Sequence, residues 1–185
     1  LLTIGSDSFQ LKRLPLRSGE LLRAWDAADE YLLEHITEQL QPVAEARILI
    51  FNDSFGALAL GLHRWKPSVI SDSYLSQAAT RLNLAENNLP ENSVSLLNSL
   101  EQPNGKFDLV IIKVPKTLAY LEDFLIRLQP FIKSDSQIIA AGMIKSLPAS
   151  VWTLLERLMG NTTTSLAKKK ARPASARWHG SPPAR

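Results

Sequence analysis

Three short segments carry polar side chains directly after apolar, strand-like runs, which is where an α/β domain binds a ligand. The first is residues 52–56, after the run 47–51. A nucleotide-type cofactor requires glycines there, so that the backbone can turn tightly and approach the ligand. Only Gly56 has the expected spacing, whereas Asn52 and Ser54 occupy the earlier glycine positions. We therefore interpret this segment first as a plain strand-to-helix turn and only second as a cofactor loop.

The second segment is Asp72, which ends the strand-like run 68–72. A carboxylate at this position can accept two hydrogen bonds from a ribose diol. It can equally cap a helix that begins near Tyr74. Because the preceding loop lacks glycines, we favour the helix cap.

The third segment contains Lys113 and Lys116, which follow the most continuous apolar run, 106–113. An enzyme that acts on an exocyclic amine needs hydrogen-bond acceptors here, and an ammonium group only donates. Two lysines at the edge of a crevice suit contacts with phosphate. The alternative is a pair of solvated surface lysines.

The rest of the sequence predicts neither a catalytic centre nor a metal site. His35, His63 and His179 are scattered, and the chain has no cysteine. Absence of cysteine suits a cytoplasmic protein. No apolar run reaches the ~20 residues that span a bilayer, so we expect no membrane partner. The opening residues lack the basic region of a signal peptide.

Strand-like and helix-like segments alternate along the chain, which predicts an α/β fold with a mostly parallel, twisted sheet and helices on both faces. We expect a first strand at 9–14 and then a long helix at 20–41, capped by Ser18. Further strands are expected at 47–51, 68–72, 93–97, 106–113, 137–141 and 162–168, and further helices at 57–62, 74–87, 117–131 and 149–159.

Charge is unevenly distributed along the 185 residues. Residues 166–185 contain six basic and no acidic residues, which leaves 15 basic and 18 acidic residues in the rest, a net −3. Attraction to a polyanion is therefore expected from the basic end and from local clusters. We expect one domain over residues 1–172, and a linker or disordered tail over the Pro-, Ala- and Ser-rich residues 173–185.

The order of motifs resembles the amino-terminal domain of the ribosomal RNA large subunit methyltransferase G family, and more distantly the small subunit methyltransferase C family. The resemblance extends over about residues 9–172. It is carried by residues 25–33, 52–58, 72–74, 113–118 and 162–172.

The resemblance implies two methyltransferase-like domains in tandem. It implies that the carboxy-terminal domain, absent from this chain, binds S-adenosylmethionine and methylates the exocyclic N2 of a guanine in 23S rRNA. Where that domain has Asp-x-Gly-x-Gly-x-Gly, this chain has Ile50, Asn52, Ser54 and Gly56. Where it has Asn-Pro-Pro-Phe, this chain has residues 113–116, Lys-Val-Pro-Lys.

The resemblance therefore predicts a Rossmann-like class I methyltransferase fold with a degenerate cofactor site and no bound cofactor. We expect this half to assist recognition of large-subunit rRNA and to stabilise the catalytic domain. The alternatives are a purely structural module without RNA contact, and a stand-alone methyltransferase with a remodelled pocket. The residues expected to contact RNA are Lys113, Lys116, Lys168, Lys169, Lys170 and Arg172.

Overall fold

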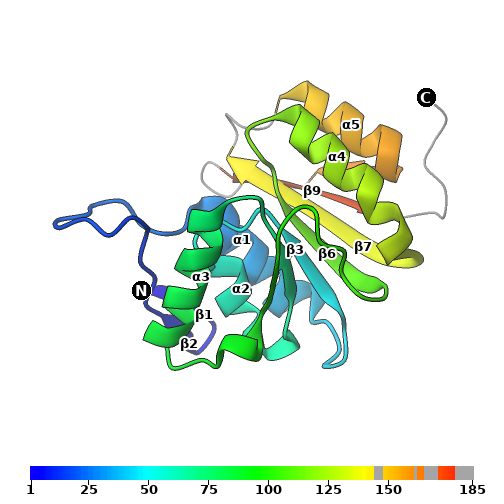
Figure 1. Ribbon diagram of the computed structural model, residues 1–185. Helices are drawn as coiled ribbons and strands as arrows, with labels where there is room; N and C mark the ends of the chain where they lie inside the picture. The colour runs from blue at the N-terminus through cyan, green and yellow to red at the C-terminus, as the bar shows by residue number, and fades with distance from the viewer. Residues whose placement is uncertain (144–147, 161, 165–170, 178–185) are drawn as a thin grey trace.

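A seven-stranded sheet forms the centre of the computed structural model (Figure 1). The structure describes residues 1–143, 148–160, 162–164 and 171–177. The strand order is β5-β4-β3-β6-β7-β9-β8; the first five are parallel, and β9 runs antiparallel to both of its neighbours. The strands are β3 (Ile48–Phe51), β4 (Ser68–Ile70), β5 (Ser95–Leu97), β6 (Phe107–Lys113), β7 (Ile132–Met143), β8 (Thr162–Thr164) and β9 (Ala171–Arg177).

Helices cover both faces of this sheet because the central strands are apolar on both sides. In β3, Ile48 and Ile50 belong to one buried cluster, and Leu49 and Phe51 belong to the other. This alternation follows from the two-residue period of a strand. The helices are α1 (Ala27–Glu34), α2 (Ala57–Gly61), α3 (Tyr74–Glu86), α4 (Leu118–Leu128) and α5 (Ala149–Met159).

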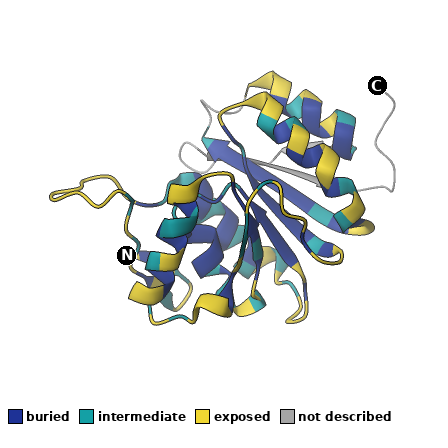
Figure 2. Ribbon diagram, viewed as in Figure 1, coloured by how far each residue is buried: buried dark blue, intermediate teal, exposed yellow. Residues whose placement is uncertain are grey.

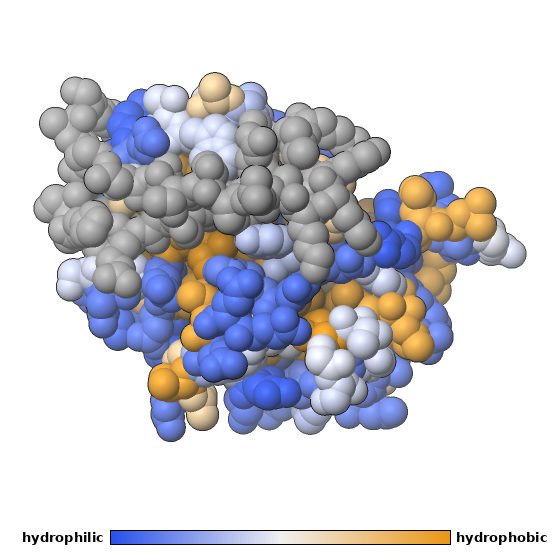
Figure 3. All heavy atoms as spheres, turned by 180° about the vertical axis from the view of Figure 1, so that it is seen from behind, coloured by the Kyte–Doolittle hydropathy of each residue, from blue (hydrophilic) through white to orange (hydrophobic). Residues whose placement is uncertain are grey.

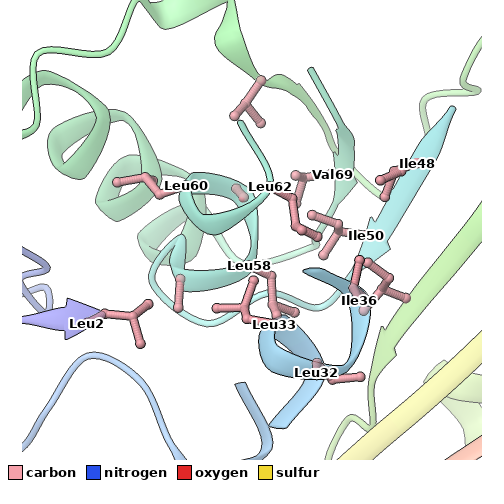
Figure 4. Packing of buried hydrophobic residues seen from close by; sticks show 14 of the residues in the cluster. Leu2, Leu32, Leu33, Ile36, Ile48, Ile50, Leu58, Leu60, Leu62 and Val69 are labelled. Atoms are coloured by element: carbon pink, nitrogen blue, oxygen red, sulfur yellow. The ribbon is translucent and has the colours of Figure 1, made fainter. Parts of the chain in front are cut away.

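The first cluster lies between the sheet and α1 and α2, as Figure 4 shows for the leucines of both helices beside β3 and β4. The second lies between the opposite face and α4 and α5. In Figure 2 the central strands are buried almost throughout, whereas the outer sides of the helices are exposed. The α/β fold, the mostly parallel sheet and the helices on both faces are confirmed.

The first 41 residues differ from the prediction. A hairpin of β1 (Leu2–Ile4) and β2 (Asp7–Phe9) replaces the strand expected at 9–14. The helix begins at Ala27 rather than at residue 20, because Asp26, and not Ser18, caps it. It continues as a π-helix, His35–Leu40, to the left-handed Gln41. Leu21 and Leu22 suggested a longer helix, but both are exposed.

The end of the domain also differs from the prediction. Strand β9 pairs with β7 from Ala171 to Arg177, so the sheet continues past the boundary expected after Arg172. The linker predicted for residues 173–177 is therefore wrong. The strand predicted at 162–168 is present as β8; residues 165–168 and 178–185 lie outside the described residues.

Candidate functional site

The carboxyl ends of β3, β4 and β6 meet at one edge of the sheet and bring the first predicted residues together. The Asn52 backbone N–H donates to the carbonyl of Ile70 at 3.0 Å, and its side-chain amide donates to the carbonyl of Lys113 at 3.0 Å. Asn52 has a φ of 65°, a left-handed conformation that asparagine tolerates better than most residues. Asn52 therefore supplies the turn that a glycine would give, and its side chain ties β3 to β6.

Lys113 lies inside the protein at this edge. Only 5% of its surface is exposed, and its Nζ lies 2.8 Å from Asp26 Oδ1 and 2.8 Å from Asp29 Oδ1. A buried ammonium that two carboxylates bind cannot reach a phosphate. The prediction that Lys113 contacts RNA is therefore wrong, because the apolar run before it continues to the end of the strand and places the side chain under α1.

The two carboxylates that bind Lys113 also form the amino-terminal cap of α1. Asp26 Oδ1 accepts from the Asp29 backbone N–H, and Asp29 Oδ2 accepts from the Asp26 backbone N–H, both at 3.0 Å. This reciprocal pair is a capping box. The sequence signal was present, since an acidic residue at the cap is followed three residues later by a second one. We name Asp26, Asp29 and Lys113 the buried ion cluster.

The charges in the buried ion cluster shift one another's pKa. Burial raises the pKa of Asp29 to about 6, against the attraction of Lys113, and the neighbouring carboxylates of Asp26 and Asp53 add to the increase. Burial lowers the pKa of Lys113, but the two carboxylates outweigh it and the net pKa is raised. For Asp26, burial is likewise outweighed by Lys113, so its pKa is lowered. At neutral pH the cluster therefore holds two carboxylates and one ammonium.

Asp53 is a second buried carboxylate that the sequence analysis did not identify. It is 2% exposed and accepts from the backbone N–H groups of Ala59 at 3.0 Å and Leu58 at 3.4 Å. Burial raises its pKa. The Ser76 hydroxyl contacts the carbonyls of Asp53 and Ser54. The Asp53 carboxylate and the carbonyls of Asp53 and Ser54 are thus all bound by atoms of the domain itself.

Gly56 has a packing reason to be glycine that requires no ligand. Its φ is +96°, a conformation that L side chains rarely adopt, and a Cβ there would lie 3.1 Å from Thr80 Cα and Thr80 Oγ1 on α3. The close approach of α3 to the loop therefore accounts for Gly56. Its retention carries no information about a cofactor.

Asp72 is exposed and does not cap α3, so the favoured interpretation was wrong. The cap is Ser73, whose Oγ accepts from the backbone N–H of Ser76 at 3.1 Å. The Asp72 backbone N–H donates to the Tyr120 hydroxyl at 3.1 Å. Burial, together with the Asp72 charge, raises the pKa of Tyr120 to about 12. The Asp72 side chain also hydrogen-bonds to the Tyr120 hydroxyl, so its carboxylate is engaged within the domain although the residue is exposed.

A hollow of about 370 Å³ lies beside α4, on the face of the sheet that α4 and α5 cover. It exists because β5 connects to the parallel strand β6 through residues 98–106 without a helix, whereas such connections usually contain one. The hollow is mostly apolar, and its walls include Leu49, Phe51, Ile70, Tyr120 and Phe124. It lies along α4 and does not include the loop 52–56.

The other predicted RNA contacts are spread over the chain. Lys116 is exposed after β6, and Arg172 lies in β9 opposite Gly142. Lys168, Lys169 and Lys170 lie outside the described residues. Within the parts of the chain that the structure describes, no group of His, Cys, Asp or Glu side chains could hold a metal ion, and no helix could cross a membrane.

The strand order, with β9 antiparallel beside β7, defines a Rossmann-like class I methyltransferase fold, and solved structures agree. The chain is similar to a Thermus thermophilus 16S rRNA N2 G1207 methyltransferase, with a TM-score of 0.68 and 20% identity over 84% of this chain and 44% of that one. The chain is also similar to a ribosomal protein L11 methylase from Lactobacillus delbrueckii subsp. bulgaricus, with a TM-score of 0.63 and 20% identity over 82% of this chain and 79% of that one. At these identities the likeness shows the fold.

The family follows from sequence comparison. The RLMG N-terminal domain family matches residues 1–179, so the chain belongs to it. Ribosomal RNA large subunit methyltransferase G of Pseudomonas fluorescens is 49% identical over 163 residues, which are 88% of this chain and 43% of the relative. The Streptomyces griseus protein of the same name is 42% identical over 92% of this chain and 45% of the relative. The chain thus spans less than half the length of these relatives.

Proposed function

We propose that this domain is the non-catalytic amino-terminal half of an S-adenosylmethionine-dependent 23S rRNA (guanine-N2) methyltransferase. In this proposal it assists rRNA recognition and stabilises the catalytic half. One observation carries the non-catalytic part: the buried ion cluster occupies the end of β6. At this position the family resemblance places the Asn-Pro-Pro-Phe motif of a catalytic domain, which accepts hydrogen bonds from the guanine amine. The Lys113 ammonium only donates hydrogen bonds and is already bound by Asp26 and Asp29.

The residues at the strand ends do not fit S-adenosylmethionine. The side chain of Asn52 bonds to β6, the carboxylate of Asp53 binds the first turn of α2, and Thr80 packs against Gly56. A cofactor would have to displace each of these contacts. We therefore propose that this domain binds no cofactor, and that the other half of the full-length protein binds S-adenosylmethionine.

The binding test is calorimetry of the chain with S-adenosylmethionine, with the intact Pseudomonas fluorescens relative as the control. We expect binding weaker than millimolar for the chain. Incorporation of labelled methyl into naked rRNA by the chain alone, abolished by Asp72→Ala, would establish the stand-alone enzyme instead.

The RNA role is supported by the names of the relatives, which are rRNA methyltransferases, by the exposed Lys116 and by the basic composition of residues 166–185. RNA binding is to be measured across a salt series for Lys116→Ala, and for a variant with Lys168, Lys169, Lys170 and Arg172 changed to Ala. Each lost phosphate contact should make the plot of log K against log salt shallower by roughly one unit. Lys106→Ala, before the opposite end of β6, is the control.

If neither variant changes the slope, the RNA role is refuted. The domain would then be the purely structural module, which the net negative charge outside the basic end favours.

A further inference from the structure

Residues 13–23 project from the body of the domain between β2 and α1, at the left of Figure 1 and the right of Figure 3. We name this segment the leucine arm. Three of its four leucines face solvent: Leu16 is 63% exposed, Leu21 94% and Leu22 65%. The segment is exposed from residue 15 to residue 23 (Figure 2), and Figure 3 shows hydrophobic surface on it. Several large apolar side chains together on a projection mark an interaction site.

The leucine arm has a defined shape. Arg13 Nη1 donates to the carbonyl of Arg23 at 3.2 Å, which joins the two ends of the arm. The Leu22 backbone N–H donates to Glu20 Oε1 at 3.0 Å, and Gly19 makes the turn with a φ of +71°. The arm therefore presents its leucines from a closed loop.

Two asparagines, Asn83 of α3 and Asn87 at the carboxyl-terminal cap of that helix, fix the foot of the arm to the body. Asn83, which is fully buried, accepts from the Lys12 backbone N–H at 2.9 Å and donates to the Lys12 carbonyl at 3.0 Å. Asn87 binds the backbone of Gln10 in the same way, at 2.9 Å and 2.7 Å. The cation of Arg13 lies 4.9 Å from the centre of the Phe55 ring. These contacts fix the position and the direction in which the arm leaves the body of the domain.

A shallow, mostly apolar depression of about 460 Å³ lies at the foot of the arm. Its lining includes Leu22, Trp25 and Met143, the last residue of β7, together with Asp26. Leu22 therefore belongs both to the leucine arm and to this depression, which Arg13 and Arg23, at the two ends of the arm, also line.

We propose that the leucine arm docks onto the second half of the protein, the part that follows this domain in its relatives. The inference rests on the proposed function in one respect, because it needs that second half to exist. The chain covers only 43% and 45% of the two relatives, so most of each lies outside the matched region. A tethered domain has an effective concentration up to the millimolar range, which favours it over a separate molecule.

The chemistry of the arm defines the surface that receives it. Leucine side chains gain by entering an apolar pocket and gain little from the phosphates of RNA. The arm has three arginines and one glutamate, and Arg23 pairs with Glu30 of α1 at 3.1 Å, which leaves a net +1. The receiving surface is therefore an apolar depression with an acidic rim.

The test uses a chimera in which this chain replaces the matched part of the Pseudomonas fluorescens relative. A photo-crosslinking amino acid, p-benzoylphenylalanine, is placed at Leu21 and, as a control, at Ile126 on α4, which is 44% exposed. After irradiation, mass spectrometry identifies the crosslinked partner in the presence of rRNA. We expect crosslinks from position 21 to the second half of the same chain, and none to that half from position 126.

Crosslinks from position 21 to rRNA, to another copy of the chimera, or to nothing would each overturn the proposal. Methylation of rRNA by the unmodified chimera tests the proposed function separately. Methylation without the crosslink would refute the docking of the arm and leave the proposed function standing. The crosslink without methylation would support the docking of the arm and count against the proposed function.

A stability measurement gives a second, independent test. Changing Leu16, Leu21 and Leu22 together to Ser should change the melting temperature of the 185-residue chain only slightly, because these side chains are mostly exposed in it. The same changes should lower the melting temperature of the chimera, whereas Ile126→Ser should lower it less. An equal effect of the arm variant in both proteins would refute the docking.

Discussion

Replacement of Lys113 by Met tests whether the buried ion cluster holds this edge of the domain together. Methionine has a similar length but no charge. It would leave the Asp29 carboxylate, whose side chain is 1% exposed, without its cation. Removal of one partner from a buried ion pair costs about 3–5 kcal/mol, because the remaining charge cannot be solvated. We expect Lys113→Met to lower the free energy of unfolding by this amount at pH 7.

The loss should depend on pH with a defined sign. Without Lys113 the folded-state pKa of Asp29 rises further above 3.8, its unfolded value. The folded state then binds more protons than the unfolded state between these two values, so stability falls as pH rises through that window. The deficit relative to the natural chain should be largest at neutral pH and smaller at pH 4.

Urea unfolding at both pH values measures the effect. Lys116→Met, on the exposed side of the same turn, is the matched control and should change stability by less than about 0.5 kcal/mol. Adding Asp26→Asn and Asp29→Asn to Lys113→Met should restore much of the loss, because it removes the unpaired charges. A Lys113→Met protein as stable as the natural chain at pH 7 would refute the role of the cluster.

Three further changes follow from single contacts, each measured by urea unfolding. Gly56→Ala should cost roughly 2–4 kcal/mol through strain and overpacking, and Gly19→Ala, with no atom in the way, only about 1 kcal/mol; equal losses would contradict the packing argument. Asp29→Asn should abolish the decrease in stability that this group causes between pH 3.8 and about 6, and an unchanged pH profile would contradict the raised pKa of Asp29. Asn83→Ala should cost about 3 kcal/mol by leaving backbone groups without partners, whereas the exposed Asn92→Ala should be nearly neutral; a small loss for Asn83→Ala would mean that the foot of the arm is held by other contacts.

Where the hydrophobic pattern was strong and local, the sequence predicted the elements. The run 106–113 became β6, and the pattern at 74–87 became α3. Burial on both faces of a parallel strand leaves a continuous apolar run that needs no knowledge of its neighbours. The same method failed at 20–41, because Leu21 and Leu22 fit a helical period although they belong to the exposed arm.

The motif order of the sequence alone also determined the family, the α/β class and the loss of the glycines at residues 52 and 54. Tertiary structure decided what the remaining residues do. Lys113 was expected at a phosphate and instead binds Asp26 and Asp29, which lie 87 and 84 residues away along the chain. A lysine's charge can be read from sequence, but its carboxylate partners are set by the packing of α1 against β7, the neighbour of β6 in the sheet, which no local pattern encodes.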